Sequence, residues 1–154
     1  MKEILAVALV VAMGFWLQTM WPYFTLWRVR NHVRYSHTGF VTLPPALVGE
    51  TLDEFLRLSA CSFESENNGM QAYYRGCQVI FRADHTTASS MIPHMIGFGV
   101  VSESDTTRVE LGYRVVPYVR MTVAAEKQFL EFARFESMRV LEILQSMACQ
   151  GEAA

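Results

Sequence analysis

A largely apolar stretch opens the chain, with no Asp, Glu, His, Lys or Arg between Ile4 and Trp27. It is about 24 residues long, whereas about 20 residues are enough for a helix rising about 1.5 Å per residue to cross a bilayer core. The pattern therefore predicts a single transmembrane helix at the N-terminus.

Three other interpretations of this stretch remain open: a cleaved signal peptide, a buried core helix and an interfacial helix. A signal peptide favours a basic start and a small-x-small cleavage site, whereas the residues before Ile4 are nearly neutral and the segment Gln18–Pro22 has no such site. An interfacial helix needs a polar face, but the apolar side chains here point in all directions around the helix axis.

Aromatic and basic residues crowd the C-terminal end of the stretch. Amphipathic rings favour the headgroup level, and positive residues favour the cytoplasmic side of a membrane. The predicted membrane-interface residues are Trp16, Trp21, Tyr23, Trp27, Arg28, Arg30 and Arg34. The other flank offers only Lys2 and the terminal amine, partly offset by Glu3. We therefore expect the N-terminus outside and the C-terminal domain in the cytoplasm.

The expected span contains no His, Asp, Glu, Lys or Arg, so it cannot ligate a haem through a histidine or relay protons. Ala8, Ala12 and Gly14 form a small-residue pattern that would allow close packing on another membrane helix. We expect the segment to act as an anchor or packing surface, with the lipid bilayer and other membrane protein subunits as partners.

After this anchor and its basic flank, residues 1–34, the pattern predicts one small α+β domain over residues 35–154. A short strand over Gly39–Leu43 is expected to stop at Pro44-Pro45, and a helix follows over Glu50–Ala60. The domain therefore starts with a strand and a short helix.

A hairpin comes next. Asn68-Gly69 predicts that a strand near Ser62–Glu66 pairs with a strand beginning at Met70. The second strand continues, bent or in two pieces, to about Ala83, and a further strand is expected over Ile96–Ser102.

Strict alternation follows a turn at Ser104–Thr106. The apolar positions are all odd: Val109, Leu111, Tyr113, Val115, Pro117, Val119 and Met121. The charged positions are even: Arg108, Glu110, Arg114 and Arg120. Alternation of this kind is typical of an antiparallel sheet covered on one face, with a bend or an edge at Pro117. The three arginines could form a basic stripe for an anionic partner.

A long helix is predicted to close the chain, from an N-cap at Thr122 to about Ala148. Its apolar surface comprises Phe129, Leu130, Ala133, Val140, Leu141 and Leu144, widened by Phe132, Phe135 and Ile143. A surface this wide suggests burial against a sheet and against a further partner.

The order of strand, helix, antiparallel strands and long C-terminal helix resembles the helix-grip, or START-like, architecture. The resemblance covers about 110 residues and consists of element order. It implies a curved sheet around the last helix with an apolar cavity between them. The candidate lining residues are Phe81, Phe98, Tyr113, Phe129 and Phe132.

Composition narrows the function classes. The formal net charge is -2, from 13 Lys+Arg and 15 Asp+Glu, which gives no reason to expect a nucleic-acid partner. The 3 cysteines lack the C-x-x-C spacing of zinc and dithiol sites, so we expect reduced thiols. His85 and His94 lack a third ligand, and nothing in the sequence places Cys77 beside either histidine, so no metal, cofactor or catalytic site is predicted.

Two functions follow from these patterns. The first is a non-enzymatic accessory or assembly subunit of a larger membrane protein complex, suggested by the anchor and the wide apolar surface of the last helix. The alternative is a membrane-tethered carrier or sensor of an apolar ligand, such as a lipid, isoprenoid or quinone, held between the sheet and that helix.

Overall fold

The computed structural model describes residues 33–151 except residues 60, 68 and 78–79. The predicted span, its small-residue pattern and its interface residues as far as Arg30 lie outside the described residues. In the described part, no helix is long and apolar enough to cross a membrane.

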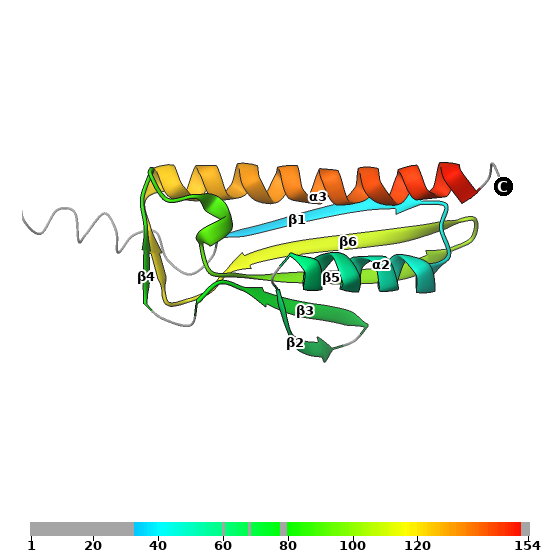
Figure 1. Ribbon diagram of the computed structural model, residues 1–154, viewed down its shortest axis with the longest axis horizontal. Helices are drawn as coiled ribbons and strands as arrows, with labels where there is room; N and C mark the ends of the chain where they lie inside the picture. The colour runs from blue at the N-terminus through cyan, green and yellow to red at the C-terminus, as the bar shows by residue number, and fades with distance from the viewer. Residues whose placement is uncertain (1–32, 60, 68, 78–79, 152–154) are drawn as a thin grey trace, which may run out of the picture.

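The described residues form a mixed α+β domain. A 5-stranded antiparallel sheet has the strand order β1-β6-β5-β3-β2, and a short helix and a long C-terminal helix pack on it (Figure 1). In this order the strands span Arg34–Val41, Thr106–Val115, His94–Glu103, Met70–Arg75 and Ser62–Asn67. Helix α3 (Val123–Gly151) lies along β1, and helix α2 (Pro45–Leu58) packs on β5 and β2. The buried core lies between the sheet and these two helices.

The first strand and the first helix both begin earlier than predicted. β1 spans Arg34–Val41 rather than Gly39–Leu43, because its polar first half pairs fully with β6 even though it lacks an apolar run. α2 begins at Pro45 rather than Glu50, because proline fits the first helical turn, where its missing N–H is not needed. The prolines stop the strand, as predicted, but they also start the helix.

The hairpin prediction is confirmed. β2 (Ser62–Asn67) and β3 (Met70–Arg75) are antiparallel, with a two-residue connection between Asn67 and Met70. The expected continuation to Ala83 occurs in two pieces, since the chain turns at Gly76 with φ 119°. A Cβ atom at Gly76 would lie 2.8 Å from the Cα atom of Pro93, so the turn is closed to larger residues.

The alternating segment also divides in two. β5 (His94–Glu103) and β6 (Thr106–Val115) form the centre of the sheet, and the odd positions Val109, Leu111, Tyr113 and Val115 are buried as predicted. The prediction of a buried side chain at Pro117 was wrong, because Pro117 is exposed while Val116 is buried, but the predicted bend at this proline is confirmed. The chain breaks there and resumes as β7 (Val119–Met121), which pairs in parallel with β4 (Phe81–Ala83).

The N-cap of α3 is confirmed: the Ala125 N–H donates to Thr122 Oγ1 at 3.2 Å. Most of the predicted apolar surface is buried against the sheet, including Phe129, Leu141 and Leu144. Phe135 is an exception, with 77% of its surface exposed. The helix therefore presents a second apolar patch, which its own sheet does not cover.

Candidate functional site

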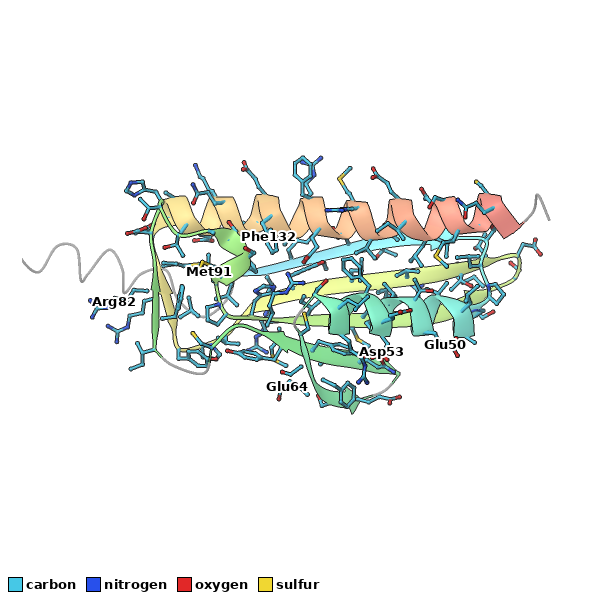
Figure 2. The ribbon with its side chains drawn as sticks, in the orientation of Figure 1. Glu50, Asp53, Glu64, Arg82, Met91 and Phe132 are labelled. Carbon is cyan, nitrogen blue, oxygen red and sulfur yellow. The ribbon has the colours of Figure 1, made fainter. Side chains whose placement is uncertain are left out.

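A surface groove lies between α3 and the loop that joins β4 to the 3-10 helix η1 (Ser89–Met91). Its volume is about 890 Å³. Figure 2 shows Phe132 of α3 close to Met91, where η1 packs against the helix. The groove is lined by His85, Thr86, Thr87, Ala88, Ser89, Gln128, Glu131, Phe132, Arg134, Phe135 and Met138.

The loop wall of the groove is held by a short-range turn. Asp84 Oδ1 accepts hydrogen bonds from the Thr86 N–H at 2.8 Å and from Thr86 Oγ1 at 2.6 Å. These bonds from Thr86 lower the pKa of the Asp84 carboxyl group. Gln128 Nε2 donates to the His85 carbonyl oxygen at 3.3 Å and so ties the loop to α3.

The helix wall supplies the apolar contacts. Phe135 is 77% exposed and Met138 is 43% exposed, three positions further along the same helix. Phe132, which is partly buried, connects these side chains to the core. Polar and charged groups of Glu131, Arg134 and the loop surround this apolar centre, an arrangement typical of protein docking sites.

Behind Phe132 lies a histidine with no solvent exposure. The His94 ring centroid is 5.1 Å from that of Phe129, 6.0 Å from Phe132 and 6.2 Å from Tyr113. His94 Nδ1 lies 2.6 Å from the Ile92 carbonyl oxygen, an acceptor, so Nδ1 carries the proton.

This histidine is a neutral, buried base. Burial lowers the pKa of His94 to about 4, with a further lowering by the Arg75 charge and an opposing effect of the Ile92 carbonyl. Its Nε2 atom has no hydrogen-bond partner among the described residues. A buried acceptor of this kind is an unmet hydrogen-bonding position in the core.

A buried ion pair lies near the histidine. Arg75 Nη1 is 2.8 Å from Glu136 Oε1, and the two side chains are only 11% and 14% exposed. Arg75 Nε also donates to Cys61 Sγ at 3.3 Å. Burial raises the pKa of Cys61, so its thiol is not activated as a nucleophile. Burial, and then the charge of Glu136, also raise the pKa of Tyr113.

A smaller pocket of about 280 Å³ lies beside α2. The Tyr73 hydroxyl group donates to Asp53, which also pairs with Arg57 at 2.8 Å. These bonds, led by that of Tyr73, lower the pKa of Asp53, while burial and Asp53 raise the pKa of Tyr73 to about 12. The carboxylate is thus occupied in holding α2 against β3.

The structure brings together only some of the residues expected to line a cavity. Tyr113, Phe129 and Phe132 surround His94. Phe98 stacks instead on Tyr73 at 5.9 Å between ring centroids, and Phe81 belongs to the separate β4–β7 sheet.

The residues considered for chemistry are also separated. His85 lines the groove and is exposed, while His94 lies in the core. Cys77 is exposed, and its carbonyl oxygen accepts a hydrogen bond from the Tyr74 hydroxyl group at 2.6 Å. Across residues 33–151, apart from the gaps, no three His, Cys, Asp or Glu side chains are grouped as metal ligands.

The groove itself had no signal in the sequence. Its two walls, residues 85–89 and 128–138, are distant along the chain and neither contains a motif. The one available hint was the width of the last helix's apolar surface, which includes Phe135 and exceeds what one sheet covers.

Comparison with known proteins gives no information about the function of this groove. No protein-family model matches the chain, and no curated protein sequence matches it. The crystal structure of TTHA0849 from Thermus thermophilus matches with a TM-score of 0.40 and 10% sequence identity, over 77% of this chain and 98% of that chain.

Proposed function

We propose that the chain is a non-enzymatic, single-pass membrane protein that serves as an accessory or assembly subunit of a larger membrane protein complex. In this proposal the apolar segment Ile4–Trp27 anchors the chain and the domain lies in the cytoplasm. The groove on α3 receives an apolar side chain or helix of a partner subunit.

One observation carries this proposal: Phe135 is 77% exposed on α3 and lies beside Met138, which is 43% exposed, although Phe129, Leu141 and Leu144 of the same helix are buried. Exposed aromatic and methionine side chains beside a groove, surrounded by polar groups, are typical of protein contact sites. The groove walls are a long helix and a hydrogen-bonded turn, so little conformational freedom would be lost when a partner binds.

The proposal is tested by the size of the particle that contains the chain. Native membranes are extracted in a mild detergent, and the complex is sized and analysed by mass spectrometry. We expect the wild-type chain in a large complex and Phe135→Ser as a free chain, because the substitution removes the apolar contact without touching the core. Phe40→Ser is the matched control, since Phe40 is 52% exposed on β1, on the sheet face away from α3. A wild-type chain that is monomeric under these conditions contradicts the proposal.

A second candidate function is a membrane-tethered carrier or sensor of an apolar ligand, such as a lipid, isoprenoid or quinone. It is favoured by the unpartnered Nε2 atom of His94, which three aromatic rings surround, and by the helix-grip-like element order. A ligand with a hydroxyl group would satisfy this acceptor once Phe132 moved aside.

The two functions are separated by what co-purifies. Solvent extraction of the purified chain followed by mass spectrometry should give one apolar compound in equimolar amount if the second function holds. His94→Leu should then release that compound while Phe135→Ser retains it. Only trace, mixed lipid in the wild-type extract would exclude the carrier.

A further inference from the structure

Two pairs of arginines are direct neighbours across strands. Arg34 of β1 is opposite Arg114 of β6, and Arg82 of β4 is opposite Arg120 of β7. Side chains of directly paired residues lie on the same sheet face, with the backbones about 5 Å apart. All four side chains are exposed.

These positive charges are not compensated within the described part of the domain. Its ion pairs use other arginines, namely Arg57, Arg75 and Arg108. The carboxylate nearest to Arg82 in sequence, that of Asp84 two positions later, accepts hydrogen bonds within its own turn from Thr86. Because like charges directly opposite each other destabilise a sheet, an external anion would relieve both pairs.

Both pairs lie at one end of the domain. The β4–β7 sheet and the start of β1 are at the end where α3 begins, opposite the C-terminus (Figure 1). Figure 2 shows the Arg82 side chain pointing away from the domain at this end. We call the surface formed by Arg34, Arg82, Arg114 and Arg120 the arginine end.

We propose that the arginine end docks on the anionic lipid headgroups of the membrane that holds the chain. This inference rests on the proposed anchor, since the seven residues from Arg28 to Arg34 span at most about 24 Å between the apolar segment and β1. Such a short connection keeps the arginine end near the lipid surface. Guanidinium groups bind phosphate oxygens through two parallel hydrogen bonds, which suits lipid phosphates.

The test uses the full-length chain in vesicles of neutral phosphatidylcholine, with or without anionic phosphatidylglycerol. Cys77 is exposed and lies near the arginine end, since its carbonyl oxygen accepts a hydrogen bond from Tyr118, the residue before β7. Cys149 is exposed near the end of α3, so each cysteine can carry a fluorophore while the other is replaced by serine. A spin-labelled headgroup lipid quenches fluorophores at the surface. We expect anionic lipid to increase quenching at Cys77 but not at Cys149.

Replacing the charged side chains tests whether the four arginines are responsible for the docking. Each arginine replaced by glutamine should lower the docked-to-undocked ratio about fivefold, and Arg82→Gln with Arg120→Gln should lower it about 25-fold. The matched control, Arg134→Gln with Arg139→Gln, removes the same charge from exposed positions of α3 and should leave quenching unchanged.

Three outcomes would overturn the inference. The first is equal quenching at Cys77 with neutral and anionic lipid, and the second is an equal effect of the control variant. The third is binding of a soluble polyanion such as heparin, shown by a change in the fluorescence of the label at Cys77, without any response to anionic vesicles.

Flotation with neutral vesicles tests the proposed anchor separately from the proposed docking. If the chain floats but fails the quenching test, the proposed anchor stands and the proposed docking is wrong. If the chain does not float, both proposals are wrong.

Discussion

Gly39 of β1 and Leu141 of α3 are in close contact: a Cβ atom at position 39 would lie 2.7 Å from Leu141 Cδ2 and 3.1 Å from Cγ. Leu141 is 7% exposed and is packed against the core, so it has little room to move away. The absence of a side chain at Gly39 therefore sets how closely the long helix approaches the sheet.

Gly39→Ala should destabilise the domain by about 1–3 kcal/mol, because the new methyl group overpacks the helix–sheet contact. Leu141→Ala should cost about 2–5 kcal/mol alone, by leaving a cavity. The double variant should cost less than the sum, since each change makes room for the other. Urea unfolding of the full-length chain in a nonionic detergent measures all three, and strict additivity would show that the two residues do not interact.

Acid should destabilise the domain through His94. Its folded-state pKa, about 4, is below the ordinary value of 6.5, so between these values the unfolded chain binds a proton that the folded chain does not. Stability is therefore lost as pH falls from about 6.5 to about 4, by about 3 kcal/mol in total. His94→Asn can still donate to the Ile92 carbonyl group but does not titrate. It should be less stable at pH 7.5 and lose less on acidification, and an unchanged pH profile would exclude His94 as the source.

Breaking the buried ion pair should be far more damaging than removing both partners. Glu136→Leu leaves the Arg75 charge buried without its partner and should cost about 3–5 kcal/mol. Adding Arg75→Met should recover much of this loss, since two apolar side chains need no compensation. Arg57→Gln, which removes an exposed pair with 62% and 34% side-chain exposure, is the control and should change the urea midpoint little. Equal losses for Glu136→Leu and the double variant would mean that packing, not charge, matters here.

Thr122→Ala should lower stability by about 1 kcal/mol, because the Ala125 N–H loses its acceptor at the first turn of α3. Thr122→Ser keeps the oxygen and should preserve most of the stability. Amide hydrogen exchange in the first turn of the helix gives a local readout. If Thr122→Ser is as unstable as Thr122→Ala, the methyl group rather than the hydroxyl group is responsible.

The sequence predicted the elements whose signals are local. A two-residue turn specified the β2–β3 hairpin, and the alternation from Val109 to Val115 specified a strand with one buried face. The predictions were wrong where a single residue has two possible structural roles. Pro45 follows the end of one element and begins the next, so the start of α2 was missed. At Pro117 the bend was predicted but the burial was not, because the break in the strand ends the alternation.

Long-range contacts explain what the sequence did not show. Arg75 and Glu136 pair over 61 positions, and Gln128 reaches the His85 carbonyl group over 43 positions. Phe135 belongs to the apolar pattern of the helix, yet it remains exposed to solvent because the sheet does not extend far enough to cover it. No window along the chain contains this information, because it depends on how strands and helix are placed in space.

The length of helix α3 sets the distance between the arginine end and Phe135. The helix begins at the end of the domain that carries Arg82 and Arg120, and Phe135 follows Val123 by twelve residues, which is about 18 Å along the helix axis. If that end rests on lipid, the groove opens at a fixed height of about 18 Å above the headgroups. A partner subunit would then need an apolar segment that projects to this level above the membrane in order to reach Phe135.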